Sequence, residues 1–447
     1  MQKILILGAG KSSPYLIHYL LEQAEQNDWV ITVGDIDLNA ARKGVSDHPR
    51  GLAVHFDIND RKQLRTLVQA ADVVIHMLAP AFQGLIAEEC VRLNSHMISA
   101  SYCNRQVREL SATAEAKGLL LLTEIGLDPG IDHMGAVDLM EKIRGQGGRI
   151  KAFRSYGSGI PAPDSRSNPL NYAITWNPWN VAMAGTGGAM YLERGKIKIV
   201  PVRRVFSYTW PVEVEGVGTL EAYPNRDSLS YIDLFQLDGV ETMIRGTLRY
   251  PGWAETWQQI ITLGLPTQAM EIPDLQTRTY REVVEMFLPL NPEVGASTVQ
   301  RLARLLSISP TGRIMDNLVW LGLLSEERIT AQGNSPADML SDLLQKKLPL
   351  LPEQRDMVIL LHELDVEYDD RREQITSTMV KYGQPGGFTA MAETVGLPAA
   401  IATRLLLQGK LNVRGCCIPI DPTIYRPILQ ELADEGITFV EKTEPLT

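Results

Sequence analysis

The first ~125 residues of the chain alternate short apolar runs with amphipathic stretches. The apolar runs predict six strands, at Lys3–Leu7, Val30–Val33, Leu52–Phe56, Val73–Met77, His96–Ala100 and Leu119–Thr123. The amphipathic stretches predict helices between them, at Ser13–Gln26, Arg61–Ala70, Gly84–Leu93 and Gln106–Lys117. This alternation is typical of a parallel sheet with crossover helices. It predicts an α/β fold with a doubly wound, Rossmann-like dinucleotide-binding domain.

The pattern changes after Gly126. Residues 155–172 are polar and rich in glycine and proline, so we expect little regular structure there. Strands are predicted next, at Lys196–Val200, Arg204–Thr209 and Pro211–Val214. A leucine-rich region from Trp253 to about Lys347 predicts helices, with a second helical stretch at Glu353–Leu364. From about Met391 the tail predicts a helix and then a short strand, Gly436–Val440.

Length, composition and charge restrict the class of protein. A chain of 447 residues is too long for one hydrophobic core, and 45% hydrophobic with 21% charged residues argues against disorder. A net charge of −10 repels phosphate backbones, so no nucleic acid partner is expected. The four cysteines form no CxxC pair, which favours a reducing compartment. No signal peptide and no run of about 20 apolar residues is visible, so we expect a cytoplasmic protein without a membrane partner.

The segment GAGKSS, residues 8–13, lies between the first predicted strand and the first predicted helix. Gly8 would allow the tight turn, and Gly10 would let the backbone approach a pyrophosphate at the helix N-terminus. Ser13 occupies the third glycine position of the GxGxxG fingerprint and is small enough for close strand–helix packing. Lys11, Ser12 and Ser13 could add contacts to the phosphates. The segment predicts a dinucleotide site.

Gly10, Lys11 and Ser12 also resemble the end of a nucleotide triphosphatase P-loop. That motif requires a glycine five positions before Gly10, where this chain has Leu5 inside the predicted strand. We therefore favour the dinucleotide fingerprint.

Four further residues could contact the cofactor. Asp35 ends the second strand, 25 residues beyond Gly10, where a carboxylate accepts hydrogen bonds from the adenosine ribose hydroxyls and repels a 2′-phosphate. It predicts that NAD is preferred, with NADP possible; the alternative is a helix N-cap or turn aspartate. Asp57 could meet the adenine edge. Ala79 and Pro80 lie where the nicotinamide end usually passes.

The segment EIGLDPGIDHM, residues 124–134, resembles the interdomain signature of the saccharopine dehydrogenases that release glutamate. Other similar segments follow in order along nearly the whole chain: SY at 101–102, SYGSGIPAPDSRSNPLNYAITW at 155–176, YPNRDS at 223–228, IRGTLRYPG at 244–252, RDMVIL at 355–360 and VGLPAAIATRLLLQGK at 395–410. The glycines alone are weak evidence, but the set together is specific.

The resemblance implies an architecture and a reaction. Residues 1–125 with about 391–447 would form the Rossmann domain, and about 126–252 with 348–390 a mixed α/β substrate and dimerisation domain. Residues from about 253 to 347 would form a helical insertion. The implied enzyme, a homodimer, moves a hydride between NAD(P) and the secondary-amine C–N bond of saccharopine, giving glutamate and aminoadipate semialdehyde in the oxidative direction.

The resemblance also implies site residues. Asp128 and Tyr102 would act at the reacting nitrogen. Saccharopine carries three carboxylates, which require cationic or dipolar anchors. The substrate-binding candidates are Arg226, Asn225, Trp176, Thr247 and Arg249. Each has a structural alternative: an ion pair for Arg226, a core phenol for Tyr102, a turn before Pro129 for Asp128 and ordinary packing for Trp176.

Departures from the family pattern leave the substrate open. Gly157 stands where the pattern has a cysteine, and the pattern often has glycine and lysine around Asn171 and Ala173. A second interpretation is a dehydrogenase of another amine–carboxylate conjugate such as carboxynorspermidine, although the two arginines speak against a polyamine. A third is a non-catalytic NAD-binding regulatory protein. The seven histidines form no HxH or HExxH motif, so no metal site is expected.

Overall fold

The computed structural model describes residues 1–290 and 295–446. The chain forms two compact units, Met1–Gly148 with Met379–Val440 (unit 1) and Arg149–Thr378 with Glu441–Thr447 (unit 2). The divisions differ from the expected domain boundaries near residues 125 and 391. One reason is the helix α7 (Ile131–Gly145), which belongs to unit 1, where the Tyr425 hydroxyl donates to Glu141 at 2.7 Å.

Unit 1 contains a seven-stranded parallel sheet in the order β16-β6-β5-β4-β1-β2-β3. Its strands are β1 (Gln2–Leu7), β2 (Trp29–Asp35), β3 (Gly51–His55), β4 (Val73–His76), β5 (His96–Ser99), β6 (Leu120–Leu122) and β16 (Gly415–Cys417). The direction of strand order reverses between β1 and β4, as in doubly wound dinucleotide folds. The predicted Rossmann-like fold is confirmed, and β16 adds a seventh strand from the C-terminal segment.

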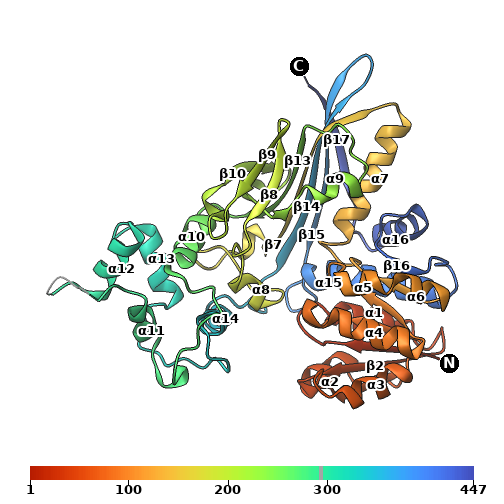
Figure 1. The fold of residues 1–447 in the computed structure, drawn as a ribbon, viewed down its shortest axis with the longest axis horizontal. Coiled ribbons are helices and arrows are strands. Elements are labelled where there is room, and N and C mark those ends of the chain that lie inside the picture. The colour runs from red at the N-terminus through yellow and green to blue at the C-terminus, as the bar shows by residue number, and fades with distance from the viewer. Residues whose placement is uncertain (291–294, 447) are drawn as a thin grey trace. The chain divides into compact units, whose positions relative to one another are not determined.

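Helices connect and cover these strands (Figure 1). They are α1 (Pro14–Glu22), α2 (Leu38–Val45), α3 (Arg61–Gln69), α4 (Gln83–Leu93), α5 (Arg105–Glu109), α6 (Ser111–Ala116), α7, α15 (Ala390–Leu407) and α16 (Pro422–Asp434), with the 3-10 turn η1 (Pro80–Phe82). The pattern missed α2, and the predicted helix at Gln106–Lys117 is two helices. Both differences concern short helices, in which the 3.6-residue period of apolar positions gives little signal.

The apolar helix α15 belongs to the core of unit 1. Among the described residues it is the one helix long and apolar enough to cross a membrane, yet 83% of that window is buried inside the protein. It packs against α1 through Gly396, where a Cβ would lie 2.9 Å from the Cβ of Leu16. Burial against other helices accounts for its apolar composition.

Unit 2 is built on a ten-stranded mixed sheet with the main path β10-β11-β13-β7-β14-β15-β17. Its strands are β7 (Arg149–Pro161), β8 (Ala189–Glu193), β9 (Lys196–Val200), β10 (Trp210–Val214), β11 (Gly218–Pro224), β12 (Arg226–Asp227), β13 (Thr242–Arg249), β14 (Asp356–Glu367), β15 (Arg372–Tyr382) and β17 (Val440–Pro445). Strand β7 pairs with β13 in parallel and with β14 antiparallel. The expected strand at Gly436–Val440 is replaced by β17, which joins this sheet.

Three sequence predictions in unit 2 are wrong. Residues 155–161, expected to be irregular, belong to β7, because pairing with a strand on either side satisfies the backbone of a glycine-rich segment. The stretch Glu353–Leu364, expected to be helical, lies mostly in β14, since a continuous buried run has no period that separates strand from helix. The expected strand at Arg204–Thr209 is the short 3-10 turn η3 (Val205–Ser207).

The leucine-rich region forms helices as predicted: α10 (Trp253–Leu263), α11 (Tyr280–Met286), α12 (Thr298–Leu306), α13 (Arg313–Leu321) and α14 (Pro336–Lys347). Capping boxes begin α11, α12 and α14, with a serine or threonine side chain accepting from the N3 backbone N–H. Helices α11 to α14 gather in one group (Figure 1). Two short helices, α8 (Pro178–Ala182) and α9 (Ser230–Leu234), and the 3-10 turns η2 (Pro163–Ser165) and η4 (Leu275–Thr277) complete unit 2.

Candidate functional site

The glycine-rich loop after β1 approaches the end of β4 closely. Gly8 has φ +107°, and a Cβ there would lie 2.8 Å from the carbonyl carbon and oxygen of Met77. The buried Ser13 donates from Oγ to the Gly8 carbonyl at 2.8 Å, and its N–H donates to Gly10 O at 3.0 Å. The Ser13 hydroxyl therefore closes the loop, and the loop does not present it to a phosphate as the sequence suggested.

The space beside Gly10 fits the approach of a pyrophosphate. A Cβ at Gly10 would meet no atom within 4 Å, and Gly10 is exposed. Lys11 is also exposed and Ser12 is half-buried. The loop leads directly into α1, whose N-terminal end carries the positive end of the helix dipole. These features are what a dinucleotide phosphate requires.

The Asp35 carboxylate at the end of β2 is held by the backbone. Its Oδ2 accepts from the Ala9 N–H at 2.7 Å, and its Oδ1 accepts from the Asp37 N–H at 2.8 Å. Asp37, and not Asp35, is the N-cap of α2, because its side chain accepts from the Asn39 N–H at 2.9 Å. Asp35 is half-buried. It joins the glycine loop to the strand end where the adenosine ribose lies in this class of fold.

The other predicted cofactor residues lie at neighbouring strand ends. Asp57 follows β3 and accepts from the N–H and side-chain amide of Asn59 at 2.9 and 3.0 Å, so its carboxylate already shapes the turn before α3. Ala79 and Pro80 follow β4 and are exposed. Because parallel strands end at the same edge of a sheet, these positions share the edge that carries the glycine loop.

Tyr102 and Asp128, 26 residues apart, are joined by a hydrogen bond. The Tyr102 hydroxyl donates to Asp128 Oδ1 at 2.8 Å, and both residues are half-buried. Tyr102 follows β5 and Asp128 follows β6, so adjacent parallel strands carry the two residues. The structure thus brings together the two residues predicted to be catalytic.

A tight glycine turn fixes the segment that carries Asp128. Gly130 has φ +148°, and a Cβ there would lie 2.1 Å from Gly126 O, so no larger residue fits. The Gly130 N–H donates to Asp132 Oδ1 at 2.7 Å, and the same oxygen lies 2.8 Å from Nδ1 of the buried His133. Asp132 therefore stabilises the first turn of α7 by accepting from the N-cap residue Gly130.

A buried polar network that the sequence did not reveal supports Tyr102. Gln83 Nε2 donates to Ser99 Oγ at 3.1 Å and to Ser101 O at 3.2 Å, while its Oε1 accepts from the Asn104 N–H at 3.1 Å. Ser99 Oγ lies 2.9 Å from His76 Nδ1. Burial lowers the pKa of His76 to about 4, so its ring is neutral near pH 7. These hydrogen bonds between uncharged side chains and the backbone hold the loop that carries Tyr102 in place.

In unit 2, Arg249 lies among aromatic rings. Its guanidinium carbon is 5.0 Å from the Tyr172 ring centroid, 5.9 Å from that of Tyr223 and 5.2 Å from that of Trp253. Nη1 donates to Leu248 O at 2.8 Å, whereas the buried Nε makes no hydrogen bond to any described residue. A buried cation with donors to spare is suited to an anionic ligand.

Thr247 and Trp176 lie beside this arginine. Thr247 and Arg249 are two residues apart on β13 and therefore share one face of the sheet. Thr247 is paired with Tyr223 on one side and with Gly157 on the other, so the family cysteine position lies next to Thr247. Trp176 donates from Nε1 to the Tyr172 hydroxyl at 3.2 Å. The predicted pocket wall is thus connected to Arg249 through Tyr172.

Arg226 and Asn225 follow β11 in the same unit. Arg226 is exposed and has φ +55°, a conformation that is uncommon outside glycine. Asn225 is half-buried, and its N–H donates to Arg245 O at 2.8 Å. The two residues continue directly from Tyr223 and Pro224. All five predicted substrate-binding residues therefore belong to unit 2, whereas the predicted catalytic and cofactor residues belong to unit 1.

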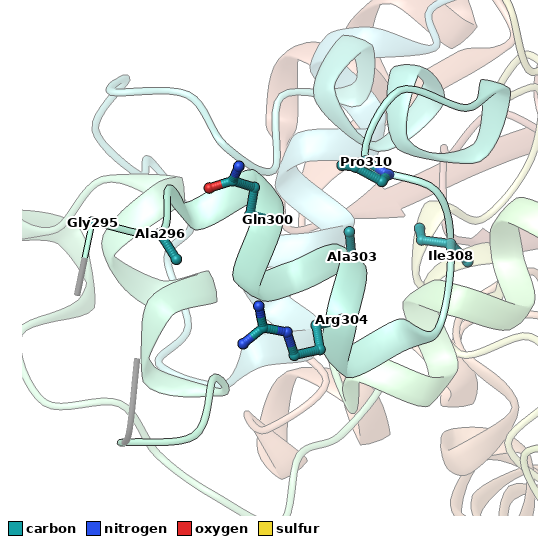
Figure 2. Close-up of a pocket in the computed structure, with 7 residues that line it drawn as sticks. All are labelled: Gly295, Ala296, Gln300, Ala303, Arg304, Ile308 and Pro310. Carbon is teal, nitrogen blue, oxygen red and sulfur yellow. The ribbon is translucent and has the colours of Figure 1, made fainter. Parts of the chain in front are cut away.

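Sequence reasoning missed the rings around Arg249. Tyr172 and Tyr223 lie within the segments that resemble the family, but no sequence motif separates a tyrosine that contacts a ligand from a tyrosine of the core. A hollow of about 480 Å³ in unit 2, beside α12, includes none of the predicted residues (Figure 2). Within the described ranges, no group of three or more His, Cys, Asp or Glu side chains could hold a metal ion.

Comparisons with known proteins identify the family. Residues 4–122 match the family described as the saccharopine dehydrogenase NADP binding domain, and residues 126–437 match that described as the saccharopine dehydrogenase C-terminal domain. The saccharopine dehydrogenase (NADP(+), L-glutamate-forming) of Schizosaccharomyces pombe is 32% identical over 99% of each chain. The mitochondrial alpha-aminoadipic semialdehyde synthase of Bos taurus is 33% identical over 99% of this chain and 48% of its own.

A solved structure gives the same result. The apo histidine-tagged saccharopine dehydrogenase (L-Glu forming) from Saccharomyces cerevisiae superimposes with a TM-score of 0.85 at 33% identity, covering 99% of this chain and 100% of that one. The resemblance seen in the sequence is confirmed over the full length. The chain therefore belongs to the saccharopine dehydrogenase family of oxidoreductases.

Proposed function

We propose that this chain is a saccharopine dehydrogenase of the glutamate-forming type. In the oxidative direction, saccharopine, NAD(P)⁺ and water give glutamate, aminoadipate semialdehyde, NAD(P)H and a proton. The observation that carries the proposal is the Tyr102–Asp128 hydrogen bond at the end of β5 and β6, on a Rossmann sheet with an open glycine loop. The names of the full-length relatives support the same reaction.

The bound nicotinamide would supply the hydride chemistry. The residues that fit it are the loop of Gly8, Gly10 and Ser13 and the strand-end residue Asp35. Their part would be to bind and orient the dinucleotide: the loop offers backbone and open space for the pyrophosphate, and the Asp35 carboxylate, held by the Ala9 N–H, would bind the ribose hydroxyls.

Tyr102 and Asp128 would handle protons at the secondary amine. Oxidation of the C–N bond requires the nitrogen to lose a proton, and hydrolysis of the resulting imine requires a base that activates water. Asp128 can accept a proton at its carboxylate, and the Tyr102 hydroxyl bonded to it keeps that carboxylate oriented. Asp128 is therefore proposed as the proton acceptor and Tyr102 as the group that positions it and contacts the same nitrogen.

Arg249 and Arg226 would anchor substrate carboxylates. Arg249 is buried, its Nε has no hydrogen-bond partner among the described residues, and its guanidinium lies over the Tyr172 ring. Thr247, on the same face of β13, can donate to the same carboxylate. Two cationic anchors favour a substrate with several carboxylates, such as saccharopine, over a polyamine conjugate.

Asp35 and the comparisons point to different cofactors. The relatives are named for NADP(+), and the N-terminal family is described as NADP binding, which points to NADP and against the NAD preference drawn from Asp35. The Asp35 charge nevertheless stands at the end of β2, where it would repel a 2′-phosphate. We infer that Asp35 lowers the use of NADP relative to NAD, whichever cofactor is faster overall.

Asp35→Asn tests this inference, with Asp37→Asn as the matched control because it removes the same charge two residues away. Asp35→Asn should raise the ratio of kcat/KM for NADP to that for NAD about tenfold, an effect of about 1.4 kcal/mol. Asp37→Asn should leave the ratio within about twofold, since it acts on the α2 cap. If both variants change this ratio equally, the change follows from the loss of one negative charge and not from the position of Asp35.

Product identification tests the proposed reaction against its two rivals. The protein is incubated with either cofactor and with saccharopine or carboxynorspermidine, and products are identified by mass spectrometry. Glutamate and aminoadipate semialdehyde from saccharopine alone are expected. Turnover of carboxynorspermidine in their place would support the second interpretation. Tight cofactor binding without any product would support a regulatory protein.

A further inference from the structure

Two cysteines of unit 1 that are 313 residues apart in the sequence lie side by side. The Sγ atoms of Cys103 and Cys416 are 3.4 Å apart, at hydrogen-bonding distance for two thiols. Cys103 lies in the loop after β5, directly after Tyr102, and Cys416 is the central residue of β16. No part of the proposed reaction uses this pair.

The surroundings of the pair favour a reactive thiolate. A hydrogen bond shared with the Cys416 thiol, with smaller contributions from Thr123 and Arg108, lowers the pKa of Cys103 against the effect of burial, whereas the same bond together with burial raises the pKa of Cys416, so Cys103 is the member of the pair that ionises first. Arg108 also donates to Cys103 O at 2.9 Å, which keeps its cation beside the loop. Cys103 is buried and Cys416 is half-buried against the same apolar cluster, so Cys416 is the more exposed member of the pair. A cysteine with a lowered pKa beside a second, resolving cysteine is the arrangement of thiols that oxidise selectively.

We propose that Cys103 and Cys416 are a reversible thiol–disulfide site, oxidised by a small hydroperoxide and reduced by a low-molecular-weight thiol. The thiolate attacks one peroxide oxygen, the O–O bond breaks, and a sulfenic acid forms while the released hydroxide takes a proton to become water. The second thiol attacks the sulfenic sulfur, the S–S bond forms and a second water leaves. Two thiols and one hydrogen peroxide thus give one disulfide and two waters, and two thiols of the reductant reverse the change.

The geometry requires only a local movement. A disulfide has an S–S distance of about 2.05 Å, so the sulfurs must approach by roughly 1.4 Å from their present separation. Backbone hydrogen bonds already fix both ends: the Cys103 N–H donates to Glu124 Oε1 at 3.0 Å, and the Cys416 N–H donates to Ser111 Oγ at 2.9 Å. The backbone at both cysteines is therefore anchored, and the sulfurs need only side-chain rotation and small shifts to meet.

The remaining cysteines differ from this pair. Cys417 is adjacent to Cys416, but its thiol donates to Arg414 O at 3.5 Å, and burial raises its pKa. Cys90 is fully buried, and burial raises its pKa well above the usual range. Oxidation should therefore join Cys103 to Cys416 and leave Cys417 as a thiol.

The bond would tie the loop that carries Tyr102 to β16. Cys103 and Tyr102 are neighbours, and Tyr102 donates to Asp128, so the disulfide restricts one of the two proposed catalytic residues. Oxidation should then change kcat more than cofactor binding. This consequence rests on the proposed function, whereas formation of the bond does not.

The experiment treats the full chain with one equivalent of hydrogen peroxide and maps peptides under non-reducing conditions by mass spectrometry, before and after dithiothreitol. The variants are Cys103→Ser, Cys416→Ser and Cys417→Ser, the last as the matched control. The expected result is one dithiothreitol-sensitive link between the Cys103 and Cys416 peptides in the wild type and in Cys417→Ser, absent in the other two.

Four outcomes would overturn the proposal: a Cys416–Cys417 link, links between different chains, oxidation to sulfinic acid without any link, or a wild type that stays fully reduced. The kcat of oxidised protein is measured separately on saccharopine. If the disulfide forms but kcat is unchanged, the expected effect on Tyr102 is wrong and the disulfide site still stands. Inactivity of the reduced protein would count against the proposed function and leave the thiol site standing.

Discussion

The Tyr102 hydroxyl donates a hydrogen bond to Asp128 Oδ1 at 2.8 Å, although neither residue belongs to the glycine loop from which the cofactor domain was recognised. The bond links the ends of β5 and β6. Because adjacent parallel strands end at one edge of a sheet, residues that follow them meet on the edge where dinucleotide folds bind ligands. The protein thus holds an oriented carboxylate at that edge.

Asp128→Asn should abolish the proton-accepting role while preserving size and hydrogen bonding. We expect kcat on saccharopine to fall roughly 100-fold or more, the usual contribution of general acid–base catalysis. The cofactor dissociation constant should change less than about threefold, because Asp128 follows β6 and not the glycine loop. Tyr102→Phe should cause a smaller loss, since the carboxylate remains. Wild-type turnover by Asp128→Asn, measured by steady-state kinetics, would contradict the assignment.

Gly8 and Gly10 should respond differently to alanine. Gly8→Ala forces a Cβ to 2.8 Å from the Met77 backbone at φ +107°, so the free energy of unfolding should fall by about 1–3 kcal/mol. Gly10→Ala meets no protein atom within 4 Å and should unfold like the wild type, yet it should weaken cofactor binding about tenfold or more by filling the pyrophosphate space. Denaturant unfolding and fluorescence titration with NADH and NADPH measure the two effects. If Gly10→Ala binds the cofactor as tightly as the wild type does, the pyrophosphate does not bind beside Gly10.

Arg249→Met should raise the KM for saccharopine by about 10- to 100-fold, the effect of losing a charged hydrogen bond of 1.5–3 kcal/mol. The control is Arg154→Met on β7, whose guanidinium donates to both Asp365 carboxylate oxygens at 3.2 Å and so is already engaged. Its KM should stay within about threefold of the wild type. If both variants raise KM equally, or Arg249→Met lowers only the melting temperature, Arg249 is a packing residue.

The buried neutral His76 should make stability depend on pH. Its pKa is about 4 in the folded chain against 6.5 as the ordinary value, because burial disfavours the imidazolium. As pH falls below about 6.5 the unfolded state binds the proton first, so the free energy of unfolding decreases down to about pH 4, by up to about 3 kcal/mol from this group. His76→Gln should flatten this part of the profile relative to the wild type. Parallel profiles in urea unfolding would exclude His76 as the cause.

The sequence predicted the parts of the fold that have a period or a motif. Strands β1 to β6 alternate with helices and were placed within a few residues, and the glycine loop lies where its motif required. The sequence failed at β7 and β14, where pairing on both sides makes a glycine-rich segment and an uninterrupted apolar run into strands. Composition cannot show such pairing, because the partner strands lie far away in the sequence.

The residues of the candidate site could likewise be predicted only in part. The resemblance supplied Tyr102, Asp128 and Arg249, but not the Gln83–Ser99–His76 network or the rings around Arg249, which exist only through tertiary contacts. The proximity of Cys103 and Cys416 could not be predicted, because no spacing rule relates residues 313 apart. Asp35 and Asp37 show a subtler limit: both aspartates follow β2, and only hydrogen-bond geometry shows which one caps α2.

The most direct test of the account is absorbance at the reduced-nicotinamide band during incubation of the purified chain with saccharopine and NAD or NADP in parallel. Absorbance should rise only when saccharopine is present, with one glutamate released for each nicotinamide reduced, and Asp128→Asn should largely abolish the rise. No reduction of either cofactor by a protein shown to bind it would contradict the proposed function.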